Sequence, residues 1–187
     1  MIALDTNLLV YAHREDSPWH DAAYARLTEL AEGRALWAMP WPCLHEFLAI
    51  VTHPRIYAPP TPLAAAVDQA EAWLESPSLT LLTESEGYWP ALRTFMQEGR
   101  IAGTQVHDAR VAALCRLHGV RELWTADRDF GRFPGLTVRN PLVGCWTRTV
   151  ITMATSCSPQ TGWSCDTGHA AVLVRWYWQT TDLMAPR

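Results

Sequence analysis

The sequence predicts an α/β fold with a mainly parallel central sheet of four to five strands, flanked by helices on both faces. Short apolar runs typical of buried strands alternate with longer segments of helical periodicity, which is the order that βα units produce. Nearly half of the 187 residues are hydrophobic, enough for a well-buried core. No uncharged apolar run reaches the roughly 18 residues of a membrane span, so we expect a soluble protein without membrane contact.

The predicted strands are short apolar runs that end at polar or turn-forming residues. The first, residues 2–4, ends at Asp5, where we expect a loop at the carboxyl end of the strand. Helix-length segments separate this run from the later ones, so the strands are expected to run parallel. The remaining strands are expected at residues 35–39, 79–82, 122–125 and 136–138.

The predicted helices begin at capping residues or prolines and end near glycine or proline. Ser17 followed by proline opens a helix that runs to about Gly33, and Thr61 followed by proline opens a second helix. Thr104 is expected to cap a later helix that stops at Gly119. Two further helices are expected at residues 43–52 and 86–98.

The last quarter of the chain differs in character from the rest. We interpret residues 1–142 as one domain and residues 143–187 as an atypical C-terminal tail with little periodicity. The tail is either a functional extension or, as we favour, read-through or frame-shifted sequence that would be disordered. Zinc ligands could come from Cys145, Cys157, Cys165 and His169. Their spacing lacks the close cysteine pair of common zinc sites, so we do not favour a zinc site.

The overall charge of -4 argues against a protein that binds nucleic acid by bulk positive charge. It does not exclude a nuclease, because carboxylates that hold metal ions count as acidic until the ions bind. The N-terminus has no basic segment followed by an apolar segment, so we expect a cytoplasmic location. Cys43 and Cys115 lie in apolar helical patterns and are interpreted as small buried side chains of a reduced compartment.

Four acidic residues stand out by their positions. Asp5 follows the first predicted strand and Asp127 the fourth, and ligands of parallel sheets bind outside the carboxyl ends of strands. Glu46 is the only charge in an otherwise apolar helix, where a carboxylate needs solvent, a partner or a metal ion. Asp108 lies in the first turns of its helix. A turn, a solvent-facing position or the helix dipole could also explain each acid alone.

Clustered carboxylates suit hard cations such as Mg²⁺ and Mn²⁺, which take oxygen ligands and accept phosphate oxygens in their remaining positions. Two such ions about 4 Å apart can activate water and stabilise the leaving oxygen of a phosphodiester displacement. The four acids therefore indicate metal-assisted phosphoryl chemistry if they converge in space.

Four short motifs stand in order along residues 1–142. They are residues 4–11 (LDTNLLVY), 45–47 (HEF), 106–109 (VHDA) and 125–130 (TADRDF). Their order and spacing resemble PIN-domain toxins of the VapC family. The resemblance implies a PIN fold, Mg²⁺ or Mn²⁺ dependence and endoribonuclease activity on RNA through a metal-activated water. It also implies a homodimer and inhibition by a cognate VapB-type antitoxin of a type II toxin–antitoxin system.

The resemblance also implies roles for individual residues. The metal-coordinating and catalytic acids would be Asp5, Glu46, Asp108 and Asp127. Supporting roles would fall to Asn7 and Thr125, which would hydrogen-bond the metal ligands and waters, and to Asp129, which would act through water. The tail departs from the family pattern.

Other interpretations stay open. A haloacid-dehalogenase-like phosphatase also begins with a strand and an aspartate, but it needs a second aspartate where this chain has Asn7. A catalytically inactive PIN module that only binds its antitoxin would be expected to lack one or more of the acids. His107, beside Asp108, could act as a general base or could simply be a solvated helix residue. Phosphate contacts could come from Arg14, Arg128 and Arg132, or these side chains could simply be solvated.

Overall fold

The computed structural model describes residues 1–143, and the predictions for the tail, including the four candidate zinc ligands, lie outside the described residues. These residues form a five-stranded parallel sheet in the order β3-β2-β1-β4-β5, which confirms the predicted sheet. The strands are β1 (Ile2–Leu4), β2 (Trp37–Pro40), β3 (Leu79–Leu82), β4 (Glu122–Trp124) and β5 (Thr137–Arg139).

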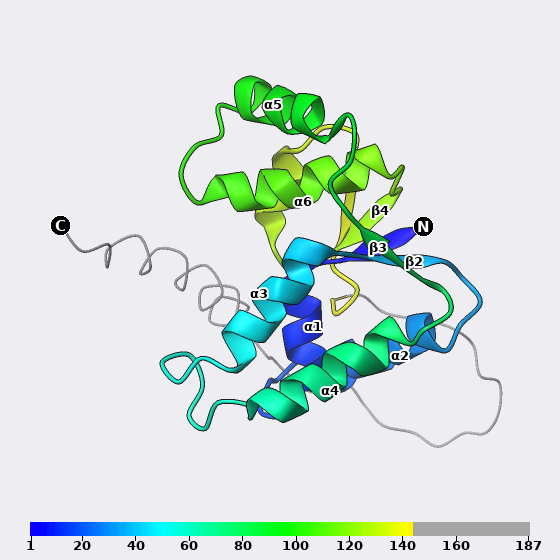
Figure 1. Cartoon of the computed structure of the whole chain (residues 1–187), viewed down its shortest axis with the longest axis vertical. Helices are drawn as coiled ribbons and strands as arrows, with labels where there is room; N and C mark the ends of the chain where they lie inside the picture. Colours follow the sequence, from blue (N-terminus) through cyan, green and yellow to red (C-terminus); the bar gives the residue numbers. More distant parts are fainter. Residues whose placement is uncertain (144–187) are drawn as a thin grey trace, which may run out of the picture.

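Helices cover both faces of the sheet, as predicted. In Figure 1, α5 and α6 lie above the sheet, while α1, α2 and α4 lie below it. The helices are α1 (Thr6–His13), α2 (His20–Ala31), α3 (Trp41–Val51), α4 (Leu63–Leu74), α5 (Tyr88–Glu98), α6 (Gln105–Leu117) and the short 3₁₀ helix η1 (Arg128–Arg132). No helix of residues 1–143 has the length and apolar character needed to cross a membrane.

Helix α1 corrects the loop that we expected after Asp5. The chain turns directly from β1 into α1, and Asp5 caps the helix by accepting a hydrogen bond from the Thr6 N–H at 2.8 Å. Residues 6–12 are all buried. A helix buried on every side has no polar face, so its sequence lacks the amphipathic periodicity that predicts surface helices.

Two predicted helix caps are wrong, and a third lacks its expected hydrogen bond. Thr104 occupies the capping position of α6, but its side chain makes no capping hydrogen bond. Helix α2 begins at His20, with Trp19 and not Ser17 in the capping position. Thr61 is buried and accepts a hydrogen bond from Arg14 Nη1 at 3.3 Å, while Pro62 occupies the capping position of α4. All three helices begin within three residues of the expected cap, so the local pattern predicts the start of each helix better than its capping contact.

Gly119 ends α6 as predicted. Its φ of +63° lies in the left-handed region, and its N–H donates to the Arg116 carbonyl at 3.3 Å. The next N–H, of Val120, donates to the Cys115 carbonyl at 2.9 Å. These two bonds form a Schellman motif, which turns the chain from α6 toward β4.

The register of the central strands positions the site. Leu4 of β1 lies opposite Trp124 of β4, so the residues that follow them, Asp5 and Thr125, lie side by side at the carboxyl ends of the strands. The Asp5 N–H extends this pairing by donating to the Trp124 carbonyl at 3.0 Å. The sheet therefore brings together two residues that are far apart in the sequence.

Replacing Gly119 by alanine should destabilise the protein. The positive φ penalises any side chain at this position, so we expect Gly119→Ala to lower the free energy of unfolding by about 1 kcal/mol. Urea unfolding followed by circular dichroism would measure the change. Gly131→Ala is the matched control, because Gly131 has no left-handed φ and an added Cβ there would meet no atom within 4 Å. Equal effects of the two substitutions would contradict the prediction.

Candidate active site

Asp5 is the most constrained of the predicted site residues. It is only 7% exposed, and hydrogen-bond donors surround both of its oxygens. Oδ2 accepts from Asn7 Nδ2 at 2.7 Å and from the Thr125 hydroxyl at 2.6 Å. Oδ1 accepts from the Thr6 N–H at 2.8 Å and from the Cys43 thiol, whose sulfur lies 3.8 Å away. This carboxylate therefore has a fixed orientation.

Asn7 and Thr125 form a polar bridge between α1 and the end of β4. Asn7 Nδ2 donates to Thr125 Oγ1 at 2.8 Å, and Asn7 Oδ1 accepts from the Ala126 N–H at 3.1 Å. The Asp127 N–H donates to Thr125 Oγ1 at 2.9 Å. These contacts connect the supporting residues to Asp5 on one side and to the Asp127 backbone on the other.

Glu46 reaches the same end of the sheet from α3. One of its carboxylate oxygens, Oε2, lies 2.5 Å from the hydroxyl of Thr6, which donates to it. The side chain of Glu46 is half-buried, and its negative charge contributes to the raised pKa of Asp5. The structure therefore brings Glu46 close enough to Asp5 for the two charges to interact.

Burial raises the pKa of Asp5 to about 7. The Thr125 hydrogen bond opposes this shift, and the charges of Glu46 and Asp108 add to it. Burial also raises the pKa of Asp108 to about 7, and the charges of Asp127 and Glu46 contribute. Electrostatic interactions thus connect all four acids that the sequence analysis selected.

Asp127 and Asp129 lie at the start of η1. Asp127 Oδ1 accepts a hydrogen bond from the Asp129 N–H at 2.8 Å and so caps this short helix. Asp129 Oδ1 lies 3.3 Å from Arg132 Nη2. The Arg132 charge lowers the pKa of Asp108, in opposition to the surrounding carboxylates. Of the three arginine candidates, Arg132 is thus the one that interacts electrostatically with the acidic cluster, by which we mean Asp5, Glu46, Asp108 and Asp127.

The predicted residues gather at one end of the sheet, but they do not form a closed set of ligands. Among residues 1–143, no group of three or more histidine, cysteine, aspartate or glutamate side chains is arranged to hold a metal ion. The donors that the four acids offer are all carboxylate oxygens, which fit hard cations better than soft ones. The chemistry of the residues therefore fits Mg²⁺ or Mn²⁺.

Three basic candidates from the sequence lie away from Asp5 or on the surface of the domain. Arg14 pairs with Asp16 at 2.5 Å and lies over the Tyr57 ring at 4.1 Å, past the last turn of α1 and away from Asp5. His107 and Arg128 are exposed. Arg14 is therefore held by Asp16 and Tyr57, and its contacts do not involve the acids of the site.

Thr6 and Cys43 also contact the acids, although the sequence assigns neither side chain a role in the site. Burial strongly raises the pKa of the Cys43 thiol, so it stays protonated and can donate to Asp5. The contact of the Thr6 hydroxyl with Glu46 and that of the Cys43 thiol with Asp5 both join the start of α1 to α3. These two contacts follow from the packing of α1 against α3 and not from the local sequence.

Comparisons with known proteins bear on this arrangement. Residues 2–136 match the family described as the PIN domain. Ribonuclease VapC48 of Mycobacterium tuberculosis is 34% identical over 140 residues, which cover 75% of this chain and 97% of that protein. VapC ribonuclease Mb2897 of Mycobacterium bovis is 33% identical over 144 residues, covering 77% of this chain and 97% of its own. The chain belongs to the PIN-domain family of VapC ribonucleases.

Solved structures of VapC proteins share the fold of this PIN domain. A VapBC2 complex from Rickettsia felis, bound to a DNA fragment from its promoter, superposes with a TM-score of 0.54 at 26% identity, covering 75% of this chain and 98% of the matched one. VapC20 of Mycobacterium tuberculosis, a Sarcin-Ricin loop cleaving toxin, superposes with a TM-score of 0.55 and covers 75% and 100% of the chains. At 19% identity, the second likeness shows the fold alone.

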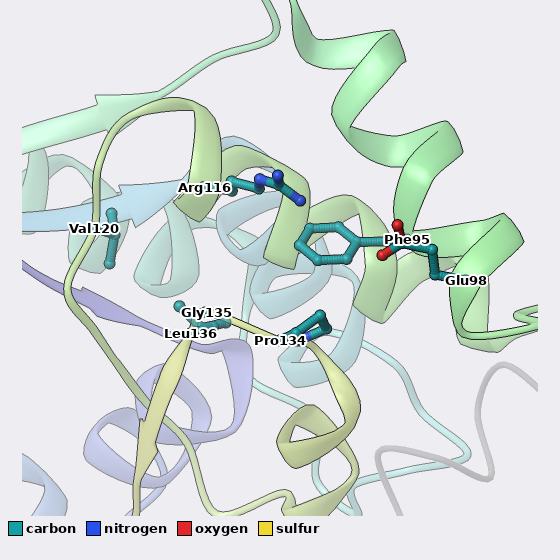
Figure 2. Close-up of a pocket in the computed structure, with 7 residues that line it drawn as sticks. All are labelled: Phe95, Glu98, Arg116, Val120, Pro134, Gly135 and Leu136. Carbon is teal, nitrogen blue, oxygen red and sulfur yellow. The ribbon is translucent and has the colours of Figure 1, made fainter.

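The PIN domain also contains a cavity of 380 Å³ away from the acids. It is lined by Phe95, Glu98, Arg116, Val120, Pro134, Gly135 and Leu136. Figure 2 shows the Arg116 side chain beside the Phe95 ring, with the guanidinium carbon 5.3 Å from the ring centroid. Val120 and Leu136 come just before β4 and β5, so the cavity lies at the amino ends of these strands, opposite the acidic cluster.

Asp108→Asn should make the stability of the metal-free PIN domain less dependent on pH. The pKa of Asp108 is raised from 3.8 to about 7, so protonated Asp108 stabilises the folded state fully below pH 3.8. This contribution is lost as the pH rises through about 7. In EDTA, we expect the thermal midpoint of the wild type to fall more steeply than that of the variant as the pH rises through this window.

Asp68→Asn provides the control, because Asp68 is an exposed carboxylate of α4, remote from the acidic cluster. Its pH profile should follow that of the wild type. If the pH profile of Asp108→Asn also follows that of the wild type, burial and neighbouring charges do not raise the pKa of Asp108 as described.

Proposed function

We propose that this chain is the toxin of a VapBC type II toxin–antitoxin system and that it is an endoribonuclease dependent on a divalent metal ion. The main support is the acidic cluster at the carboxyl ends of β1 and β4, in a chain 34% identical to a VapC ribonuclease. The reaction is the hydrolysis of phosphodiester bonds in RNA.

Asp5, Glu46, Asp108 and Asp127 would hold Mg²⁺ or Mn²⁺. Their shared oxygen chemistry and the raised pKa values of Asp5 and Asp108 support this role, because a cation would favour the ionised carboxylates. When bound, the ion supplies an activated water and neutralises charge that develops on the phosphate.

Neighbouring polar residues orient the acids for metal binding. Asn7 and the Thr125 hydroxyl keep one oxygen of Asp5 in place before any ligand arrives. The Thr125 hydroxyl also accepts the Asp127 N–H, which fixes the chain at the start of η1. Asp129 acts from the edge of the cluster, through water and through its ion pair with Arg132.

Arg132 would contact a phosphate of the RNA next to the cleaved bond. Its guanidinium is partly exposed, is held by the carbonyl and carboxylate of Asp129, and acts electrostatically on Asp108. A guanidinium with several donors can bind a phosphate oxygen while it keeps a carboxylate partner. The otherwise acidic site would thereby gain one contact for its anionic substrate.

We further propose that a VapB-type antitoxin binds and inhibits this toxin in the cytoplasm and that the toxin forms a homodimer. The fold shared with the VapC chain of the Rickettsia felis VapBC2 complex, at 26% identity, supports an antitoxin partner. The family resemblance is the basis for the homodimer.

The rival functions have less support. A haloacid-dehalogenase-like phosphatase does not agree with the family match, and position 7 carries an asparagine that donates to Asp5. A catalytically inactive PIN module would be expected to lose acids, yet all four are present and interact electrostatically. RNA cleavage is therefore the function that best fits the residues.

We also propose that residues 1–142 are the PIN domain and that the tail is not needed for activity. The curated relatives match about three quarters of this chain but 97% of their own lengths, which supports this boundary. A chain ending at Leu142 should therefore cleave RNA at least as well as the full chain.

Substitution of the acids should abolish cleavage. We expect Asp5→Asn and Asp108→Asn to reduce the cleavage of total RNA by at least about 100-fold, because each removes a charged oxygen ligand. The assay compares purified, antitoxin-free protein in Mg²⁺, Mn²⁺ and EDTA. Asp68→Asn should behave like the wild type. Cleavage that persists in EDTA would contradict metal dependence, and full activity of the variants would remove these residues from the site.

Arg132→Ala should weaken RNA binding uniformly across sequences. Loss of one phosphate contact to single-stranded RNA should raise KM and flatten its dependence on salt, by roughly 0.7 in the logarithmic slope. Cleavage of a short RNA at several salt concentrations gives this slope. Arg26→Ala is a matched control, because Arg26 also forms an ion pair with an acid three residues away but lies on α2. An unchanged slope for Arg132→Ala would exclude the phosphate contact.

A further inference from the structure

The proposed mechanism so far gives no role to the side chain of Thr6. This hydroxyl is buried, with only 1% of the residue exposed, and it lies 2.5 Å from Glu46 Oε2. An ionised carboxylate can only accept hydrogen bonds, so the hydroxyl is the donor. A hydrogen bond to a charged acceptor is roughly twice as strong as one between neutral groups.

The position of Thr6 in its helix leaves the hydroxyl available for Glu46. Threonine inside a helix commonly donates to the carbonyl four residues earlier. Thr6 is the first residue of α1, and the residue four positions before it belongs to β1. The side chain therefore turns toward α3, which packs against α1.

Thr6 also contacts the second acid. Its N–H donates to Asp5 Oδ1 at 2.8 Å, while its hydroxyl donates to Glu46. A single residue thus holds one carboxylate from the end of β1 and one from α3. Glu46 has a longer side chain than Asp5 and is half-buried, so a fixed oxygen restricts its rotation more than packing alone would.

We propose that Thr6 is a positioning residue that orients Glu46 next to Asp5, so that both carboxylates are arranged to bind the divalent cation. This inference rests on the proposed metal-dependent function. Neither the composition nor the motifs assign the Thr6 side chain to this task; the contact across α1 and α3 does.

The test compares Thr6→Val with Thr6→Ser. Valine has nearly the same shape as threonine but cannot donate, whereas serine retains the hydroxyl. Mn²⁺ binding is measured by the electron paramagnetic resonance signal of the free ion, without RNA. We expect Thr6→Val to weaken Mn²⁺ binding by about 10- to 100-fold and Thr6→Ser to remain close to the wild type. RNA cleavage by Thr6→Val should recover in part at high Mn²⁺ concentration.

A double-mutant cycle separates an effect through Glu46 from a general loss of packing. In a Glu46→Ala background, the hydroxyl has no carboxylate to orient, so Thr6→Val should weaken Mn²⁺ binding little further. An equal loss with and without Glu46 would overturn the positioning role. If Thr6→Val does not fold by circular dichroism, Thr6→Ala replaces it in the same cycle.

The outcomes distinguish this inference from the function on which it rests. Wild-type protein that binds no Mn²⁺ would overturn the proposed metal site and the role of Thr6 with it. Wild-type protein that binds Mn²⁺, together with Thr6→Val of the same affinity, would overturn the role of Thr6 alone. Weakened binding by Thr6→Val, restored by serine and absent from the Glu46→Ala background, would support the inference.

Discussion

The burial of Asp5 is the constraint on which the rest of the site depends. A carboxylate that is 7% exposed is costly unless donors satisfy it, and its donors come from α1, α3 and the end of β4. These segments must all be in place before the charge can be buried. The same contacts bring Glu46 and Asp127 toward Asp5, so the requirement to satisfy one buried group organises the cluster.

The sequence allowed the sheet and most helices to be predicted, because surface helices and buried strands differ in periodicity. It did not reveal α1, since a helix buried on all sides resembles any other apolar segment. Thr61 carries the residue type of a helix cap, but its hydroxyl accepts from Arg14 and Pro62 takes the capping position. Thr104 takes the capping position of α6 without a capping hydrogen bond from its side chain. Local patterns thus predicted the elements better than they predicted the details of their ends.

The acidic residues could be selected from their places after strands and in helices, and their electrostatic proximity agrees with that selection. The family resemblance pointed to Asn7 and Thr125 as hydrogen-bond partners, but the other contacts of the acids could not be predicted. Thr6 lies in the first motif and Cys43 in an apolar helix, but nothing local assigns their side chains to Glu46 or Asp5; those contacts arise because α1 packs on α3. Arg14 shows the opposite case, a charged residue near a motif that packs with Asp16 and Tyr57 instead.

The central place of β1 in the sheet has a consequence for synthesis of the protein. Strand β1 pairs with β4, which lies much later in the chain and begins only at Glu122. The last of the four acids, Asp127, leaves the ribosome shortly afterwards. A nascent chain therefore cannot assemble the acidic cluster until most of the domain has been translated, and fragments from interrupted translation lack it. The complete set of four acids is thus a property of the nearly full-length domain and not of its N-terminal half.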